Sequence, residues 1–494
     1  MTAALRIGAG DGLDVEAAAQ EAGVSGTPAL ITAEGVLTFG ALAGRVAHAA
    51  AALRAAGVQA GQRVAFRAVS RPDSVVVFLA LARLGVAWLP IHARLGDAEA
   101  GEVLAAAEPV TRMSEADVTA LAAGHASAAT TADRPAAGVA LDEAAPGADI
   151  LALMATSGTT GHPKVAALPR AAFLASAAAS ADNLGWSGDD RWLCCMPLAH
   201  VGGLSIVTRC LIARRPVVLL PRFEVAPVLE AIERHRATML SVVPTMLGAL
   251  LAADHGSVLS RLRVVLVGGA SCPDALLEEC ARRGVVALTT YGTTEACSQI
   301  TAQRLPPFDA APAVVPGSGR ALAGVELAIF DDHGGPCAPG VIGRIHMRGP
   351  ARMRGYLGQP PLADDAWFDT GDLGHLDETA SLFVAARRTD LVISGGENVY
   401  PAEVERVVDA CPGVRRSLVF GVPDERWGQV VAVALVVEPA GVSASAFAGA
   451  LATRLAPHKR PRLACVVDAL PETRAGKVDR SGALAALGAR LGRL

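Results

Sequence analysis

The chain has 494 residues, with 44 Lys and Arg against 48 Asp and Glu and a net charge of −4. At about 100–200 residues per domain, this length predicts several domain-sized units with a sizeable core. The near balance of charge argues against a nucleic-acid-binding protein, which usually carries a basic stripe. Hydrophobic residues make up 52%, but no apolar run approaches the ~20 residues of a spanning helix, so we expect no stable membrane insertion.

The start of the chain and its cysteines predict a reduced, cytoplasmic setting. The first residues lack the basic and apolar segments of a signal peptide. The nine cysteines form no CxxC pair and no cluster with metal-ligand spacing. We therefore expect free thiols and a cytoplasmic protein, and a homo-oligomer remains open.

The N-terminal half alternates between helical and extended patterns. Apolar residues at helical spacing predict a first helix, namely Leu42, Val46, Ala49 and Leu53. An extended run at 61–66 follows, and residues 75–84 and 85–90 repeat the helix-to-strand order. This alternation predicts an α/β fold with a largely parallel sheet.

The later segments divide the chain in two. Residues 116–149 are rich in Ala, Gly and Thr, show little periodicity and predict a linker. Short apolar strands are expected at 150–154 and 261–267. Near the C-terminus we expect a helix from Pro401, strands at 416–421 and 430–437, and a helix near 445–455. The prediction is a large N-terminal domain of α/β subdomains (1–386) and a small α+β C-terminal domain (387–494), joined by a hinge near 386–390.

The strongest local signal is a Gly/Thr-rich segment that follows the strand at 150–154. Its hydroxyls, glycine amides and one lysine could cradle phosphates, although a surface turn is the alternative. It is not a Walker A loop, because Lys164 is followed by Val165. The phosphate-binding candidates are Thr156, Ser157, Gly158, Thr159, Thr160 and Lys164.

Three further segments are individually weak. The run 290–295 ends in Glu295, which could be a Mg²⁺ ligand or a capping residue. In 367–372, two carboxylates flank a Thr-Gly turn, so an Asx-type turn is the simpler interpretation. In 471–480, Lys477 lies on a glycine-containing loop and could simply be solvated.

Together and in this order, the four segments resemble the acyl-adenylate-forming superfamily over residues 30 to 485. The resemblance implies an enzyme that uses ATP, Mg²⁺ and coenzyme A. It assigns 156–164 to the β- and γ-phosphates, and it implies these further ATP- and AMP-binding residues: Gly269, Ala270, Tyr291, Gly292, Asp372 and Arg387. Catalytic roles are implied for Thr294, Glu295 and Lys477, with Glu295 as the Mg²⁺ ligand.

The resemblance also implies two conformations. Lys477 would bridge the substrate carboxylate and the phosphate during adenylation, where its charge stabilises the transition state. The small domain would then rotate near 387–390, and Ser394, Gly395 and Gly396 would line the tunnel for the CoA thiol. Three residues depart from the family pattern, namely Val165, Ala386 and Arg344.

The acid is suggested by the segment 192–206, which is similar to that of the o-succinylbenzoate–CoA ligases of menaquinone biosynthesis, with Ala199 in place of a phenylalanine. The resemblance implies that Arg209 meets the second carboxylate of this substrate, which suits a guanidinium. The alternative places Arg209 on the surface at a helix end. His200 is expected to shape the pocket wall, and Ser298 to bound it.

Two other functions remain open. The first is CoA ligation of another acid, such as an aryl, short- or medium-chain or malonyl-type acid. A monocarboxylic acid would give Arg209 no partner. The second is an adenylating enzyme that loads a carrier protein in trans. For the CoA-ligase interpretations, the expected partners are small molecules, namely a carboxylic acid, ATP and coenzyme A.

Overall fold

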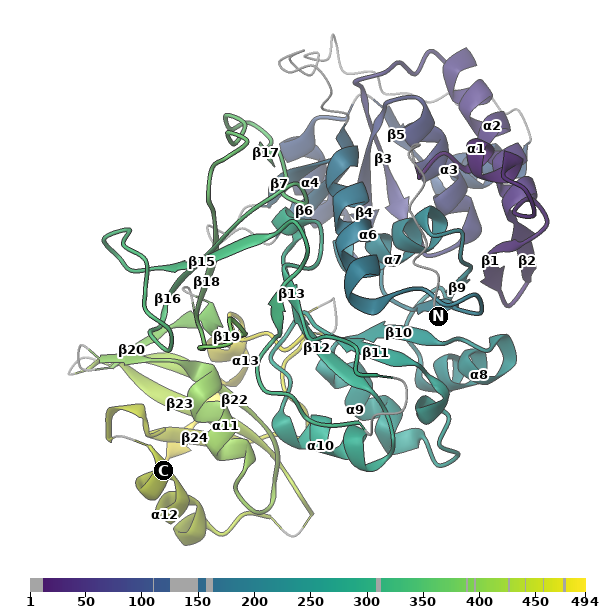
Figure 1. Cartoon of the computed structure of the whole chain (residues 1–494). Coiled ribbons are helices and arrows are strands. Elements are labelled where there is room, and N and C mark those ends of the chain that lie inside the picture. The colour runs from purple at the N-terminus through teal and green to yellow at the C-terminus, as the bar shows by residue number, and fades with distance from the viewer. Residues whose placement is uncertain are drawn as a thin grey trace.

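Figure 1 shows the computed structural model, in which three sheets form a large N-terminal part and a fourth sheet forms a small C-terminal part. The structure describes residues 12–109, 111–124, 150–156, 163–307, 312–387, 390–394, 397–424, 427–439, 441–455, 457–473 and 477–494.

The largest sheet has nine strands in the order β14-β13-β12-β11-β10-β8-β9-β1-β2. Its centre is parallel, from β12 to β1, and its two edges are antiparallel. The strands are β1 (Pro28–Thr32), β2 (Gly35–Thr38), β8 (Trp192–Cys194), β9 (Val217–Leu219), β10 (Met239–Val242), β11 (Val264–Val267), β12 (Ala287–Tyr291), β13 (Thr301–Ala302) and β14 (Arg320–Ala321). Strand β11 confirms the apolar strand expected at 261–267, since a strand covered on both faces is apolar throughout.

A second sheet of six strands has the order β17-β7-β6-β4-β3-β5. Strands β3 to β6 are parallel, and β7 and β17 add an antiparallel edge. Its strands are β3 (Arg63–Ala68), β4 (Ala87–His92), β5 (Thr111–Met113), β6 (Ile150–Thr156), β7 (Lys164–Pro169) and β17 (Gly355–Tyr356). The departure Val165 is therefore a buried strand residue and not part of a loop.

Helices fill the space between the two sheets. One core joins apolar residues of both sheets to those of the intervening helices. These helices are α1 (Val15–Gln20), α2 (Phe39–Ala55), α3 (Pro72–Arg83), α5 (Glu115–Ala123), α6 (Arg170–Leu184) and α7 (Val201–Ile212). The apolar face predicted from Leu42 to Leu53 is buried in α2, which confirms the first helix.

The outer faces of the two sheets are covered by separate helices. On the six-stranded sheet this helix is α4 (Asp97–Ala107). On the nine-stranded sheet they are α8 (Val225–His235), α9 (Pro244–Ala253) and α10 (Asp274–Arg282). The result is a layered α/β architecture, as expected from the alternating sequence pattern.

The prediction of a linker over 116–149 was wrong for its first residues, which are helical. Residues Glu115–Ala123 form α5, which Ser114 caps by accepting a hydrogen bond from the Asp117 amide. Alanines separate its buried Val118 and Leu121, so the helical period is weak in the sequence although the capping box was readable. Residues 125–149 lie outside the described residues.

The third sheet has four antiparallel strands in the order β15-β16-β18-β19. They are β15 (Glu326–Phe330), β16 (Gly343–Arg348), β18 (Phe368–Leu376) and β19 (Leu382–Arg387). The departure Ala386 is buried in β19 opposite Leu373.

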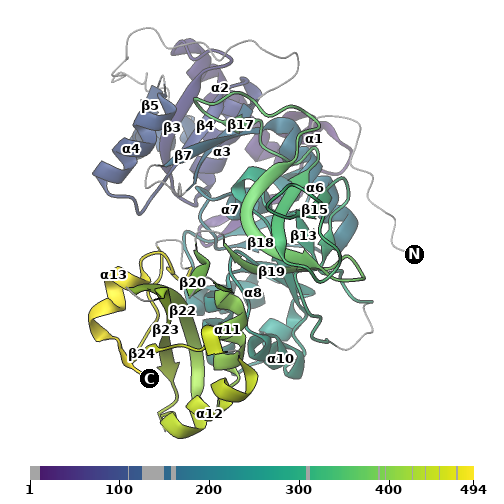
Figure 2. The same cartoon turned by 90° about the vertical axis from the view of Figure 1, so that its left-hand side faces the viewer.

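The small C-terminal part has its own sheet and core, as expected for an α+β unit. Its elements are β20 (Val392–Ser394), β21 (Glu397–Val399), α11 (Pro401–Asp409), β22 (Val414–Asp424), β23 (Gly428–Val437), α12 (Ala444–Arg454), β24 (Leu463–Val466), α13 (Ala483–Leu487) and β25 (Gly492–Arg493). Figures 1 and 2 both show α11 beside α10 of the large part. An exposed ion pair joins these helices, with Arg406 Nε 4.0 Å from Asp274 Oδ2.

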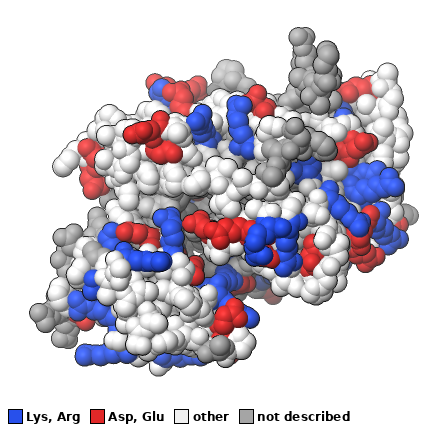
Figure 3. All heavy atoms as spheres, turned by 60° about the horizontal axis from the view of Figure 1, so that its bottom comes forward, with Lys and Arg blue, Asp and Glu red and all other residues white. Residues whose placement is uncertain are grey.

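On the face shown in Figure 3, basic and acidic side chains are interspersed. Among the helices of the described residues, none has the length and apolarity needed to cross a membrane.

Candidate active site

The predicted adenine-binding segments meet at the carboxyl ends of two neighbouring parallel strands. Gly268 follows β11 and Gly292 follows β12, and Val267 pairs with Thr289. Ligands of open α/β sheets bind outside such strand ends. Ala270 is exposed at this edge.

Gly292 permits a close approach of the chain to itself. A Cβ at this position would lie 1.6 Å from the Ser298 carbonyl oxygen, so no larger residue fits without moving the backbone. The approaching segment has two non-glycine residues at positive φ, Cys297 at 48° and Ser298 at 100°. Such strain persists where surrounding contacts hold it and is frequent at functional sites. One contact is the Ser205 hydroxyl, 3.3 Å from the Ser298 hydroxyl.

Asp372 is held where the third sheet meets the nine-stranded sheet. The Tyr291 hydroxyl donates to Asp372 Oδ2 at 2.7 Å, and the carboxylate is largely buried. Across the strand pair, Asp372 faces Arg387. Two residues predicted at the nucleotide are therefore brought together, although the side chain of Arg387 lies outside the described structure.

The turn before Asp372 explains the departure at Arg344. Asp369 accepts the Gly371 amide at 2.9 Å, which forms the expected Asx-type turn. Arg344 donates to Asp369 from Nε and Nη2, at 3.1 and 2.5 Å. Burial raises the pKa of Asp369, but the Gly371 amide and Arg344 outweigh it and leave this pKa below its usual value. Arg344 thus stabilises the turn that presents Asp372.

The phosphate-binding prediction is only partly covered by the described residues. Thr156 ends β6 and pairs with Lys164, the first residue of β7. The Thr156 hydroxyl donates to the Lys164 carbonyl at 3.4 Å. The four remaining candidates lie outside the described residues, namely Ser157, Gly158, Thr159 and Thr160.

Thr294 and Glu295 open a short 3₁₀ turn, Thr294–Ala296, directly after the Gly292 turn. Glu295 Oε1 accepts the Tyr356 hydroxyl at 2.7 Å. Among the described residues, no group of three or more His, Cys, Asp or Glu could hold a metal ion. A single carboxylate fits Mg²⁺ carried on a nucleotide, because this ion usually takes one or two carboxylates, phosphate oxygens and waters.

Lys477 reaches the large part of the molecule. A Cβ at Gly269 would lie 3.0 Å from Lys477 Cε and 3.2 Å from its Nζ. Gly269 is at φ +77°, so it is the residue type suited to this close approach. The ammonium group therefore lies at the predicted nucleotide edge.

His200 precedes α7, and its ring centroid is 5.0 Å from that of His92. Burial lowers the pKa of His200 to about 4, with help from the charges of His92 and Lys477. His200 is consequently neutral near pH 7 and only weakly basic, which suits the expected role in the pocket wall better than that of a general base.

Arg209 lies on the same face of α7 as Ser205 and is only 3% exposed, which excludes the alternative of a surface residue. Its Nη2 donates to the Ser176 hydroxyl at 3.0 Å, and that hydroxyl donates to the Cys297 carbonyl at 2.9 Å. Its guanidinium also lies 5.9 Å from the Trp192 ring. Burial lowers the pKa of Arg209 to about 10, so the group remains a cation near pH 7.

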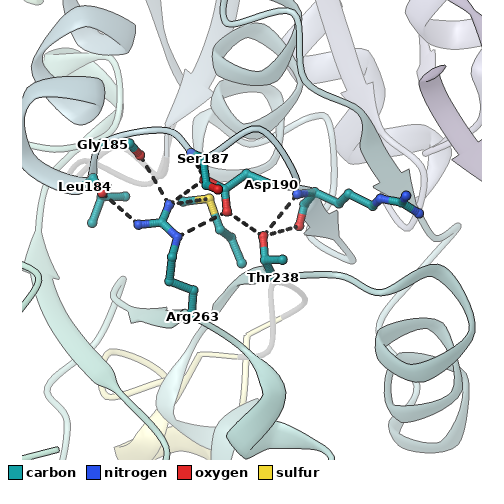
Figure 4. A network of polar contacts seen from close by, with 8 residues as sticks. Leu184, Gly185, Ser187, Asp190, Thr238 and Arg263 are labelled. Atoms are coloured by element: carbon teal, nitrogen blue, oxygen red, sulfur yellow. Dashed lines mark hydrogen bonds and ion pairs between the residues drawn. The ribbon is translucent and has the colours of Figure 1, made fainter. Parts of the chain in front are cut away.

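A network of polar contacts lies at the end of α6, the helix that carries Ser176 (Figure 4). Arg263 donates to both oxygens of Asp190, at 2.8 and 3.1 Å, and to the carbonyl of Leu184 at the end of α6. The Thr238 hydroxyl also donates to Asp190, at 2.8 Å. The network ties the connection between α6 and β8 to the nine-stranded sheet.

In the small part, Ser394 ends β20 and is buried. Gly395 and Gly396 lie outside the described residues. A second network joins this region to the Lys477 loop. Arg480 contacts Asp390 at 3.5 Å and Glu405 at 2.5 Å, and it donates to the Val419 carbonyl at 2.9 Å.

Sequence reasoning missed several residues of the site, notably Tyr356, Ser176, His92 and Arg480. Tyr356 could have been singled out because the chain has only three tyrosines. The others carry no local signal, since their partners are distant in the sequence.

The comparisons with known proteins agree with this geometry. The AMP-binding enzyme family matches residues 15–357, and the AMP-binding enzyme C-terminal domain matches 403–477. A 2-succinylbenzoate–CoA ligase of Listeria monocytogenes serotype 4b (strain F2365) is 36% identical over 450 residues, covering 90% of this chain and 93% of that protein. An indoleacetate–CoA ligase of Aromatoleum aromaticum is 36% identical over 471 residues, covering 90% and 92%.

A solved structure is similarly close. The o-succinylbenzoate CoA synthetase of Bacillus subtilis, in complex with the acyl-adenylate intermediate OSB-AMP, has a TM-score of 0.80 and 32% identity, covering 94% of this chain and 96% of that one. From its two matching family regions, its relatives and its fold, this chain belongs to the AMP-binding enzyme family.

Proposed function

We propose that this chain is an ATP-dependent, AMP-forming acid–CoA ligase whose acid is 2-succinylbenzoate. The enzyme class rests on family membership and on the residues gathered at the strand ends. The substrate rests on one observation, the buried guanidinium of Arg209.

Arg209 is a buried cation that meets no carboxylate in the described part of the chain. It forms no ion pair with any described residue, and its Nε has no hydrogen-bond acceptor among them. An unpaired buried charge costs several kcal/mol, by the order of magnitude known for broken buried pairs. The spectator carboxylate of a dicarboxylic acid would offset this cost through charge-assisted hydrogen bonds.

The proposed reaction has two steps. The carboxylate oxygen of the acid attacks the α-phosphorus of ATP, and pyrophosphate leaves. The CoA sulfur then attacks the acyl carbon, the thiol proton is released, and AMP leaves. Glu295 and Thr294 would hold Mg²⁺, and the bound ion would neutralise negative charge on the phosphates.

In this proposal, residues of the chain position the nucleotide and line the acid pocket. The proposed role of Asp372 is to accept a ribose hydroxyl, and the hydrogen bond from Tyr291 positions its carboxylate for this role. Lys477 brings its positive charge to the nucleotide edge beside Gly269. The imidazole of His200 is neutral, so it lines the site without offering a second positive charge to the carboxylates of the acid.

One specific observation favours a second candidate, an aryl monocarboxylic acid. The indoleacetate–CoA ligase is as similar to this chain as the first 2-succinylbenzoate ligase, at 36% identity. A monocarboxylic acid would leave Arg209 unpaired in the complex, which is why we prefer the dicarboxylate.

The experiment is CoA-dependent AMP release with 2-succinylbenzoate, indoleacetate and benzoate. In Arg209→Met, the KM for 2-succinylbenzoate should rise about 30- to 160-fold, from the loss of ~2–3 kcal/mol in charge-assisted hydrogen bonds, while the KM for ATP stays within about twofold. Arg209→Lys keeps the charge, so its KM for 2-succinylbenzoate should rise less than that of Arg209→Met. Arg215→Met, six residues later in the following loop, is the control.

A wild-type preference for indoleacetate or benzoate would refute the substrate. An unchanged KM in Arg209→Met would refute the role of the arginine. The division into 1–386 and 387–494, a cytoplasmic location and a role in menaquinone synthesis are parts of the same proposal.

A further inference from the structure

Tyr356 lies between the two charged residues predicted at the ATP phosphates. Its hydroxyl donates to Glu295 Oε1 at 2.7 Å. Its ring lies beneath the Lys164 ammonium, with Nζ 5.2 Å from the ring centroid. One side chain therefore contacts both the proposed Mg²⁺ ligand and the lysine of the phosphate loop.

The backbone fixes this arrangement from both ends. Strand β17 pairs with β7 so that Tyr356 faces Ala166, and the Leu357 amide donates to the Val165 carbonyl at 2.9 Å. At the other end, the Met353 amide donates to the Glu295 carbonyl at 2.6 Å. The segment 353–357 is thus hydrogen-bonded both to the strand that carries Lys164 and to the turn that carries Glu295.

The contacts keep two opposite charges apart. Lys164 and Glu295 are both described residues, and no ion pair joins them. A direct pair would occupy the ammonium group and the carboxylate, and each would lose strength as a partner for phosphate or metal. The tyrosine instead gives the lysine a π face and occupies one carboxylate oxygen of Glu295. Among the described residues no hydrogen bond occupies the other oxygen, which can face an ion.

We propose that Tyr356 is a positioning residue for Mg·ATP. It holds the Glu295 carboxylate and the Lys164 ammonium in separate orientations, one toward the metal and one toward the phosphates. The inference rests on the proposed adenylating function but not on which acid is used.

The test measures nucleotide binding by calorimetry on the full-length protein, without acid or CoA. Tyr356→Phe keeps the ring and removes the hydroxyl, so the Kd for Mg·ATP should rise roughly tenfold or more, as expected for a lost hydrogen bond to a charged group. The Kd for ATP in EDTA should not change. Tyr356→Leu also removes the ring, and it should weaken ATP binding in EDTA as well.

Tyr400→Phe is the matched control, since it removes a phenolic hydroxyl in the small part and should leave both Kd values at those of wild type. Thermal midpoints of all variants, measured without nucleotide, separate loss of folding from loss of positioning. Equal Mg·ATP binding by wild type and Tyr356→Phe would overturn the inference, and so would a loss of the same size with and without Mg²⁺ in that variant.

The two proposals can fail separately. If no acid is turned over but Tyr356→Phe selectively weakens Mg·ATP binding, the proposed substrate fails and the positioning role stands. If 2-succinylbenzoate is turned over and Tyr356→Phe binds Mg·ATP normally, only the positioning role fails.

Discussion

The buried imidazole of His200 is expected to make the stability of the protein depend on pH. Burial, His92 and Lys477 all disfavour its charged form, which lowers the folded-state pKa to about 4 from 6.5. Between these values the unfolded chain binds more protons than the folded one. Stability should therefore be complete above pH 6.5 and decline as the pH falls toward 4.

For this residue we predict that His200→Gln flattens the pH dependence of stability. Between pH 7 and pH 5, wild type should lose up to about 2 kcal/mol more than the variant, the value that linkage gives for this shift. Urea unfolding of the full-length wild type and variant at pH 7 and pH 5 measures this difference in the free energy of unfolding. Parallel losses in the two proteins would show that His200 is readily protonated in the folded state.

At the scale of the elements, a charge pair between Arg344 of β16 and Asp369 of β18 lies beside the turn that precedes Asp372. Arg344 and Asp369 are each about one-third exposed, with side-chain accessibilities of 29% and 31%, so solvent screens their attraction. The pair contributes to geometry more than to stability, because Asp369 also caps the Gly371 amide.

We accordingly expect Arg344→Glu to destabilise the protein by at most ~1 kcal/mol, by the magnitude of partly exposed pairs. Its larger effect should be on nucleotide binding, with a severalfold rise in the KM for ATP. The double variant Arg344→Glu/Asp369→Arg restores opposite charges and should recover part of the stability but not the cap on Gly371. Complete recovery of the ATP KM in the double variant would argue against the capping role.

In the whole molecule, the contact of Lys477 with Gly269 connects the small part to the proposed nucleotide site. Lys477→Ala should slow adenylation by about 10²–10³-fold, the cost of removing one preorganised charge partner. Thioester formation from supplied acyl-adenylate should remain largely intact, because the proposed role of the lysine is confined to adenylation. Pyrophosphate release and thioester formation are assayed separately.

Lys459→Ala provides the control for this variant, since Lys459 pairs with Glu403 within the small part and should leave the ratio of the two rates unchanged. Equal loss of both steps in Lys477→Ala would contradict the assignment of the lysine to adenylation.

The sequence predicted most of the layered fold, because buried parallel strands and amphipathic helices leave a pattern over neighbouring residues. It failed where alanines blurred that pattern, as in α5. Within the site, Asp372 and Glu295 were predicted from the combination of four segments, because each of their motifs alone is weak. The partner of each could not, since Tyr291 and Tyr356 lie 81 and 61 residues away and reach them only through the arrangement of strands. For Arg209, the sequence allowed either a buried pocket residue or a surface residue at a helix end, and only the packing in the structure distinguished the two.

The contacts of Arg480 have a consequence for domain exchange between relatives. One guanidinium joins Asp390, near the junction, to Glu405 in α11 and lies three residues after Lys477. A chimera cut after Asp390 would separate that aspartate from the arginine with which it folds. A chimera that takes residue 390 and everything downstream from one relative should keep these contacts. It would transfer the loop of Lys477 together with the two carboxylates that bind Arg480.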